Sequence, residues 1–405
     1  MNTMKEASTA TRTKNNRFKQ TEVGLIPEDW DIRFLPELAW FQEGPGLRNW
    51  QFKKTGIKVV NITNMVNGTL DLDRTDRHIS TDELNKMYKH FLIDDGDILM
   101  ASSGNSYGKI SIASAVHLPL LMNTSVIRFK NNQNASLQFL KSFLSSPYFK
   151  TQIDLMITGG AQPNFGPAHL KKVIVAAPSL PEQTAIAQAL SDADALIAGL
   201  EKLIEKKKKI KQGAMQELLR PKEGWVKKKL GDLAEIVMGQ SPLSKYYNSK
   251  AIGLPLIQGN ADILNRKTII RNYTAVITKK GRSGDIIMSV RAPVGEVSRA
   301  TFDCCLGRGV CAIRFPNDYL YHYLVFFENN WSKVSTGSTF ESVNAAQVQD
   351  VYIDLPKFES IQIEIASTLS DMDNEISTLN GKLSKAVLTK QGMMQNLLTG
   401  KIRLV

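Results

Sequence analysis

The chain has 405 residues, of which 42% are hydrophobic and 22% charged, and its formal net charge at pH 7 is +12. This length predicts two to three domains, and the basic balance indicates a polyanionic partner, more often nucleic acid than an anionic membrane surface. The sequence shows no apolar run of membrane-spanning length and no hydrophobic signal core near its start, so we expect neither a membrane protein nor a secreted one.

The few cysteines favour the reducing environment of the cytoplasm. Cys304, Cys305 and Cys311 are an odd set without CxxC spacing, which argues against a disulfide framework and against a zinc site. The five histidines show no paired spacing typical of metal ligands. We therefore expect a cytoplasmic protein with no metal, whose cysteines serve as small apolar side chains in strands.

The first half of the chain predicts an arm and then a globular domain. Residues 1–20 are polar, basic and without periodicity, which favours a flexible arm. Residues 21–178 contain short apolar runs separated by Gly, Pro and Asn, and these indicate a mixed domain. Its expected strands are Ile57–Ile62, Ile98–Ala101, Ile110–Ala113, Ser125–Phe129 and Ile174–Ala177, and its expected helices are Leu137–Phe143 and Tyr148–Ile157.

A long helix is predicted over residues 179–221, and its sequence recurs within residues 358–405, which we predict to form a second long helix and a C-terminal tail. The stretch from Gln183 to Leu219 aligns without a gap with Gln362 to Leu398. In both copies apolar residues alternate at spacings of four and three, which is typical of a coiled coil. We predict that the two helices pack against each other through this seam, formed by Ile186, Leu190, Ile197, Leu200, Ile204, Leu218, Ile365, Leu369, Met372, Ile376, Leu379, Leu383, Met393 and Leu397.

Lysines interrupt the predicted seam. Lys207 and Lys211 fall on it in the first helix, and Lys390 occupies the position equivalent to Lys211 in the second. Buried like charges are costly, so we expect this end of the coil to loosen or to contact another chain.

Residues 222–357 predict a second globular domain that repeats the first more faintly. Trp225 matches Trp30, and Gly239 matches Gly44. The segments GDILM at 96–100 and IRF at 127–129 recur as GDIIM at 284–288 and IRF at 313–315. The matching residues are mostly apolar or glycine, which predicts two similar scaffolds that present different surfaces.

This organisation resembles the specificity subunit of type I restriction–modification enzymes. The resemblance rests on FKQTEVGLIPEDW near the start, SLPEQTAIAQAL before the first helix, and KQGAMQELL and KQGMMQNLLTGKIRL at the helix ends. It implies an α/β (α+β) protein with a pseudo-two-fold internal repeat, in which two target recognition domains are joined by two antiparallel spacer helices. Each domain would read one half of a split sequence in double-stranded DNA.

The resemblance also implies partners that carry the chemistry. Two modification (methyltransferase) subunits and the restriction subunits, which are translocases and endonucleases, would dock on the spacer helices. S-adenosylmethionine, ATP and Mg²⁺ are expected on those partners. The chain itself has no NPPY-like loop and no glycine-rich methyl-donor loop, and Gly104–Ile110 lacks the spacing and the hydroxyl of a phosphate loop. We therefore expect a non-catalytic reader of DNA.

Side chains that read DNA need paired hydrogen-bond groups for bases, and cations or hydroxyls for phosphates. We select such residues in loops where the two scaffolds stop matching. The candidates in the first domain are Arg48, Asn49, Lys53, Lys54, Asn61, Asn64, Ser102, Ser103, Asn105, Tyr107, Gln162, Asn164 and Phe165. Those in the second domain are Gln240, Ser241, Lys245, Tyr246, Asn248, Gln258, Asn260, Arg291, Arg308, Ser338 and Thr339.

Two other functions stay open at this point. A free-standing DNA methyltransferase is opposed by the missing donor and base-flipping motifs. A coiled-coil scaffold with incidental positive charge would bind DNA without regard to its sequence. Neither the recognised sequence nor the spacer between its halves follows from the residues.

Overall fold

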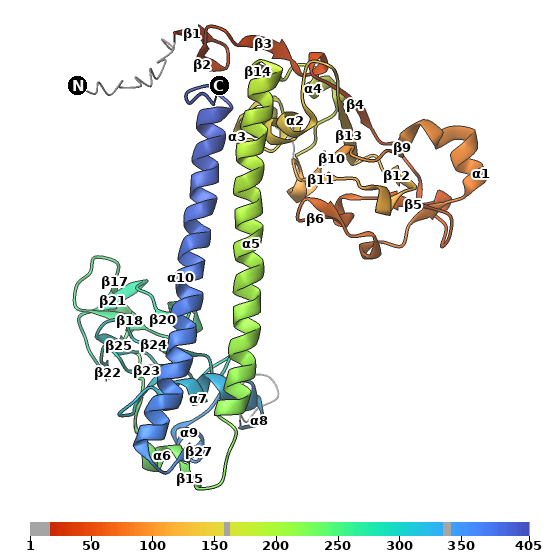
Figure 1. The fold of residues 1–405 in the computed structure, drawn as a ribbon. Coiled ribbons are helices and arrows are strands. Elements are labelled where there is room, and N and C mark those ends of the chain that lie inside the picture. The colour runs from red at the N-terminus through yellow and green to blue at the C-terminus, as the bar shows by residue number, and fades with distance from the viewer. Residues whose placement is uncertain (1–16, 158–162, 335–341, 405) are drawn as a thin grey trace, which may run out of the picture. The chain divides into compact units, whose positions relative to one another are not determined.

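The computed structural model describes residues 17–157, 163–334 and 342–404. The chain forms two compact units, and each long helix contributes one part to each unit (Figure 1). The first unit is formed by residues 1–199 and 383–405, and the second by residues 200–382.

The two long helices match the sequence prediction closely. Helix α5 spans Leu180–Leu218 and helix α10 spans Glu359–Leu397, and each has 39 residues. The helix segments run in opposite directions in both units. In the second unit Lys207 contacts Glu375 and the later Lys211 contacts the earlier Asp373. In the first unit Asp194 contacts Lys390, and the earlier Glu182 contacts the later Arg403. Every predicted seam residue is buried or half-buried. The prediction of an antiparallel apolar seam is therefore confirmed within each unit.

The expectation of a loosened end is wrong. In the second unit Lys211 forms an ion pair with Asp373, and Lys207 lies 2.6 Å from the Glu375 carboxylate. In the first unit Lys390 pairs with Asp194 in the equivalent way. Acidic residues of the opposite helix compensate the lysine charges, so the seam stays closed at these positions.

The first unit contains two four-stranded sheets and smaller strand pairs. Strands β11, β10, β13 and β4 form one sheet in that order, and β8, β5, β12 and β9 form the other. All pairs are antiparallel except β5 with β12. The strands of the two sheets are β4 Ala39–Glu43, β5 Ile57–Val60, β8 His78–Ile79, β9 Leu92–Ile93, β10 Ile98–Ala101, β11 Ile110–Ile112, β12 Leu120–Met122 and β13 Val126–Asn131.

Hairpins and short helices complete this unit. The remaining strand pairs are β1 Phe18–Thr21 with β2 Gly24–Pro27, β3 Asp31–Phe34 with β14 Ile174–Ala177, and β6 Met65–Val66 with β7 Thr69–Leu70. The helices are α1 Thr81–Glu83, α2 Leu137–Leu144, α3 Pro147–Met156 and α4 Pro167–Leu170. The predicted arm is wrong for residues 18–20, because they form β1, and residues 1–16 lie outside the described range.

The second unit repeats this order of strands. One sheet runs β16, β26, β23, β24, β20, β19, and the other runs β17, β21, β18, β25, β22. The first contains β16 Glu235–Met238, β19 Ile263–Leu264, β20 Lys267–Thr268, β23 Ile286–Ser289, β24 Val297–Arg299 and β26 Val310–Arg314. The second contains β17 Tyr247–Asn248, β18 Leu254–Ile257, β21 Asn272–Thr274, β22 Lys280–Gly281 and β25 Cys304–Leu306.

The other elements of the second unit also have counterparts. Strand β15 Trp225–Lys229 pairs with β27 Tyr352–Pro356, as β3 pairs with β14. Its short helices are α6 Leu230–Leu233, α7 Tyr319–Phe327, α8 Trp331–Val334 and α9 Ala345–Gln349. The predicted internal repeat of the globular domains is therefore confirmed at the level of sheet topology, and the predicted strands and helices of the first domain all appear.

A buried ion pair recurs in the two scaffolds. The GDI and IRF segments lie on adjacent strands in both units, with Asp97 Oδ2 3.5 Å from Arg128 Nη1 and Asp285 Oδ1 3.0 Å from Arg314 Nε. The predicted match of the two IRF segments is wrong by two residues, because Ile98 pairs with Phe129 whereas Ile286 pairs with Ile313. The position of Arg314 is therefore that of Lys130, which lies 3.7 Å from Asp97. Burial raises the pKa of the Asp97 carboxyl. Because these side chains bind each other, the repeated charged residues belong to the frame rather than to the binding surface.

Two matched glycines permit a close approach of the backbone. A Cβ atom on Gly44 would lie 2.1 Å from the carbonyl oxygen of Asn123, and one on Gly239 would lie 2.0 Å from that of Gly307. Any larger residue would separate these segments in either unit. The matched glycines thus fix the loop after β4 against the end of β12, and the loop after β16 against the end of β25.

The cysteines lie in strands, as predicted. Cys304 and Cys305 belong to β25 and Cys311 to β26, and all three are buried. Burial raises the pKa of the Cys304 and Cys311 thiols to about 12. Both side chains are therefore neutral and unreactive packing groups at neutral pH.

Candidate nucleic-acid interface

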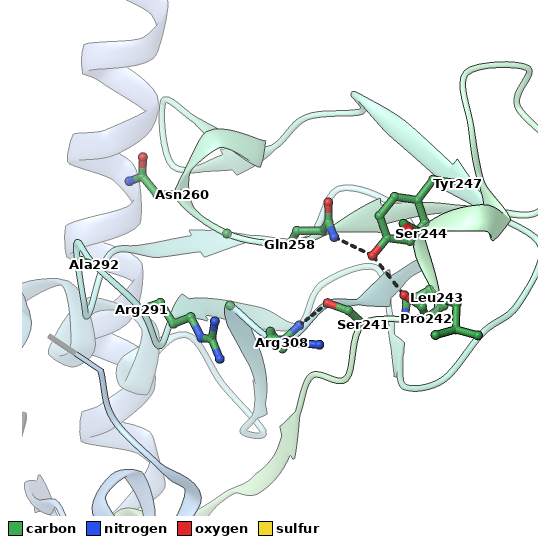
Figure 2. Close-up of a pocket in the computed structure, with 12 residues that line it drawn as sticks. Ser241, Pro242, Leu243, Ser244, Tyr247, Gln258, Asn260, Arg291, Ala292 and Arg308 are labelled. Carbon is green, nitrogen blue, oxygen red and sulfur yellow. Dashed lines mark hydrogen bonds between the residues drawn. The ribbon is translucent and has the colours of Figure 1, made fainter. Parts of the chain in front are cut away.

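In the second unit, the ends of four strands meet around an open pocket of about 520 Å³ (Figure 2). Ser241 follows β16, Gln258 follows β18, Arg291 follows β23, and Arg308 lies in the turn from β25 to β26. Five of the predicted residues, including Asn260, line this one pocket. The sequence had separated them by as many as 67 positions.

Hydrogen bonds hold the polar wall of this pocket. Gln258 Nε2 donates to Tyr247 Oη at 2.8 Å, and Tyr247 Oη donates to the Pro242 carbonyl at 3.1 Å (Figure 2). The Arg308 backbone N–H donates to Ser241 Oγ at 3.0 Å. The loops are therefore tied together before any ligand binds, which reduces the entropy that binding would cost.

The charge of the pocket is positive. Arg291 and Arg308 are exposed, and neither guanidinium bonds to another described residue. Among the described residues, the lining contains no Asp or Glu. Arg266, Arg299 and Arg314 of the same unit are instead paired with acidic side chains. As far as the described residues show, the two pocket arginines can direct their donors to a ligand with several acceptors, such as guanine or phosphate.

The other candidates of the second unit lie around this site or outside it. Gln240, Lys245 and Tyr246 are exposed, with the Lys245 ammonium 5.1 Å from the centre of the Tyr246 ring. Asn248 is half-buried, and its amide bonds the backbone of Lys250, Ile252 and Tyr273, so it shapes a turn. Ser338 and Thr339 lie outside the described residues.

The equivalent strand ends of the first unit carry different side chains. Asn61 follows β5 and occupies the position of Gln258, and Ser103 occupies that of Arg291. The shared position is supported by matching bridges, Ser103 with Asn164 and Arg291 with Ser342. Asn123 Nδ2 donates to Asn61 Oδ1 at 2.6 Å, and the exposed Thr124 occupies the position of Arg308.

Several first-unit candidates are available at the surface. Arg48, Asn49, Lys53 and Lys54 are exposed around one turn, and Asn105 and Asn164 are exposed in two further loops. Tyr107 is already engaged, because its hydroxyl bonds both Lys150 and Asp154. The hydrogen bond from Tyr107 lowers the pKa of the Asp154 carboxyl.

Three first-unit candidates are wrong as exposed contacts. Asn64 is fully buried and bonds the Asn61 and Asp71 backbone. Ser102 is buried beside the end of β10, and Phe165 packs in the core against Phe149. These side chains support the loops rather than face a ligand. Gln162 lies outside the described residues.

Sequence reasoning also missed residues of the site. Asn123 and Thr124 escaped because the β12–β13 turn has no matched motif, although its counterpart contains the selected Arg308. Trp50 escaped because only polar residues were selected, yet its side chain is 72% exposed between Arg48 and Lys53. Two simple signals would have found them: alignment of the two turns, and an indole inside a basic loop.

Other kinds of site were also sought. Among the described residues, no group of three or more His, Cys, Asp or Glu side chains is placed to hold a metal ion. No described helix is long and apolar enough to cross a membrane. Fold and site together define an internally repeated binding protein with polar and cationic strand ends.

Comparison with known proteins shows which family this binding protein belongs to. The sequence profile of the type I restriction modification DNA specificity domain matches residues 27–212 and again residues 222–388. A putative type I restriction enzyme MjaX specificity subunit of Methanocaldococcus jannaschii is 30% identical over 96% of this chain and 97% of its own length.

Solved structures share the fold. The type I restriction–modification system S subunit from M. genitalium has a TM-score of 0.59 at 16% identity, with 91% of this chain and 96% of that chain covered. A chain from a study of complex assembly and conformational transition of the type I R-M system has a TM-score of 0.57 at 22% identity, covering 93% and 99%. The chain therefore belongs to the family of type I restriction–modification DNA specificity subunits.

Proposed function

We propose that this specificity subunit reads a split DNA sequence, with one half-site contacted by the strand ends of each unit. The observation that carries the proposal is the pair of equivalent positions with different chemistry. Arg291 and Arg308 occupy them in the second unit, and Ser103 and Thr124 in the first. Equal frames with unequal side chains are suited to two unlike half-sites.

The two chemistries favour different base edges. Arginine donates two parallel hydrogen bonds to O6 and N7 of guanine, so the pocket of the second unit is suited to a half-site that contains guanine. Amide side chains pair with adenine N6 and N7. Asn61 and Asn123, which bond each other at 2.6 Å in the free chain, would exchange that bond for one to the base. The basic balance of the whole chain adds affinity for phosphates that salt weakens.

We further propose that the chain does not catalyse. Methylation from S-adenosylmethionine would belong to modification subunits, and cleavage with ATP and Mg²⁺ to restriction subunits, all docked on α5 and α10. The paired helices support this division, since they leave long outward faces for partners. The cellular compartment would be the cytoplasm, in keeping with three free cysteines.

One experiment tests the reading of DNA. Methylomes of cells with and without this gene should differ at a single bipartite motif, and Arg308→Ala should relax that motif in one half only. Loss of methylation at all positions equally would contradict base reading by Arg308. Methylation by the purified chain alone would favour a free-standing methyltransferase, and binding without sequence preference would favour a scaffold.

A further inference from the structure

A tryptophan projects from the turn that follows the Gly44 loop. Trp50 is the middle residue of the single helical turn Asn49–Gln51, and its side chain is 72% exposed. Scattered exposed apolar residues are common on soluble proteins, so exposure alone indicates nothing. The surroundings of Trp50 are what distinguish it.

The turn is anchored on both sides. Leu47 and Phe52 pack against the core formed by Val59, Ile79, Leu84 and Leu121. Gln51 is buried, and its amide donates to Glu83 and, at 3.0 Å, to Tyr88 Oη. Gln51 Oε1 also accepts from the Arg48 backbone N–H at 2.7 Å. The indole is therefore held on a rigid base, which lowers the entropy cost of using it in a contact.

Three cationic residues lie within four positions of Trp50 in the chain, and Lys53 Nζ donates to the Trp50 carbonyl at 3.5 Å. Arg48, Lys53 and Lys54 are exposed, and none of them forms an ion pair with a described carboxylate. The nearby Glu83 carboxylate accepts from Gln51. This surface is complementary to a partner that is anionic and also offers a flat apolar face. Duplex DNA has both properties, in its phosphates and in the sugar–base edges of its grooves.

The equivalent turn of the second unit also presents an aromatic side chain, one position later in the turn than Trp50. This turn, Ser244–Tyr246, follows the Gly239 loop as Asn49–Gln51 follows the Gly44 loop. Tyr246 is 40% exposed and lies beside Lys245, and the neighbouring Leu243 and Ser244 line the arginine pocket. The turn with its exposed aromatic and cation is thus part of both candidate interfaces, although the sequences of the two turns differ.

We infer that Trp50 is an aromatic anchor that contacts the DNA of the first half-site, and that Tyr246 has the same role at the second. The inference rests on the proposed function and adds an apolar contact to it. The flanking cations would hold phosphates while the indole packs on the groove edge of a base step. Changing an aromatic that stacks on a base to Ala costs about 5- to 100-fold in affinity, and we expect a loss within this range for the contact of Trp50.

The test uses the full chain in complex with its modification subunit and a labelled duplex that carries the methylated motif. Trp50→Ala should weaken binding about 5- to 100-fold, whereas Trp50→Phe, which keeps an aromatic face, should stay close to wild type. Leu155→Ala is the matched control, because Leu155 is also 72% exposed but lies on α3. Thermal unfolding should be unchanged in all three variants, since neither side chain is buried.

A spectroscopic measurement isolates the contact. The emission difference between wild type and Trp50→Phe reports Trp50, and target DNA should shield that emission from acrylamide. Shielding by the modification subunit without DNA would assign the turn to a protein contact and overturn the inference. Normal motif preference with unchanged Trp50→Ala affinity would overturn it too. A wild-type complex without motif preference would instead contradict the proposed function.

Discussion

The two units of this chain have the same frame and differ at the ends of their strands. The frame is kept by buried groups that recur, such as Asp97 and Asp285, each paired with a cation of the neighbouring strand, and the glycines after β4 and β16. The strand ends carry Ser103 and Thr124 in one unit and Arg291 and Arg308 in the other. The comparison shows how a protein can change its ligand without changing its fold, because these variable side chains form no ion pair or side-chain hydrogen bond with the rest of the described frame.

The units also differ in how their parts are connected. In the second unit, α5 continues directly through residues 219–224 into β15. In the first, the segment after α10 returns to the start of the globular domain without a covalent link. There Arg403 bonds Asp29 at 2.8 Å and Glu182 at 2.8 Å, and Trp30 Nε1 donates to Glu182 at 3.1 Å.

Arg403→Ala should break this non-covalent connection and give the largest effect. It leaves the Glu182 side chain, which is 1% exposed, without its cation. An uncompensated buried charge costs about 3–5 kcal/mol, so the free energy of unfolding of the first unit should fall by that order. Urea unfolding followed by hydrogen exchange would separate the two units. Lys401→Ala is the control, and an equal effect of both changes would refute the role of Glu182.

Acid should destabilise the second unit through His322. This side chain is buried on α7, bonds Ser370 Oγ at 2.9 Å, and burial lowers its pKa to about 4. Between about pH 4 and pH 6.5 the His322 imidazole binds a proton in the unfolded chain, where its pKa is near 6.5, but not in the folded unit. Stability is therefore complete above about pH 6.5 and falls by roughly 3 kcal/mol as the pH drops to about 4.

The first unit offers the comparison for this pH effect, because its equivalent helix α2 contains no histidine. Hydrogen exchange at pH 7 and pH 5 should show faster exchange around α7 without a matching change around α2. His322→Asn should flatten the pH dependence of the second unit. A pH dependence that survives this change would assign it to other groups.

Substitution of the pocket arginines by lysine should show whether the second unit reads guanine. Arg291→Lys and Arg308→Lys keep the charge but lose the fork-shaped donor, so discrimination at a guanine should fall by about 1–3 kcal/mol while general affinity is kept. Methylation of duplexes with single base changes would measure this loss. The effect should be confined to one half-site, and uniform weakening would make both residues phosphate contacts.

The smallest effect is expected for the ion pairs of the helix seam, which are equivalent in the two units. Asp194→Asn and Asp373→Asn remove the partner of Lys390 and of Lys211, respectively. Both pairs are partly exposed, so each change should cost about 1 kcal/mol or less and should cost less at high salt. Urea midpoints of the single variants would test this. A much larger effect of one change would show that the two seams are not equivalent.

Much of the fold was predictable because apolar spacing carries it. The coiled-coil ladder fixed the seam of α5 and α10, and β10 and β14 were predicted to the residue. The seam ion pairs were missed, because the apolar spacing gives the direction and face of each helix but not which residue of one helix lies opposite which residue of the other, as Asp194 does to Lys390. The buried positions of Asn64 and Ser102 could not be recognised from residue type, since both are polar residues in loops.

The first unit is built from two separate stretches of the chain, and this determines when it can be completed during synthesis. Residues 200–382 form the second unit from one continuous stretch, whereas the first unit combines residues before 200 with residues after 382. During synthesis, domains usually fold from the N-terminus onwards. Here the unit that starts first is completed last, since Trp30 and Glu182 wait for Arg403. A ribosome that stalls after residue 382 but before Arg403 would therefore hold an incomplete first unit and a second unit whose residues have all been synthesised.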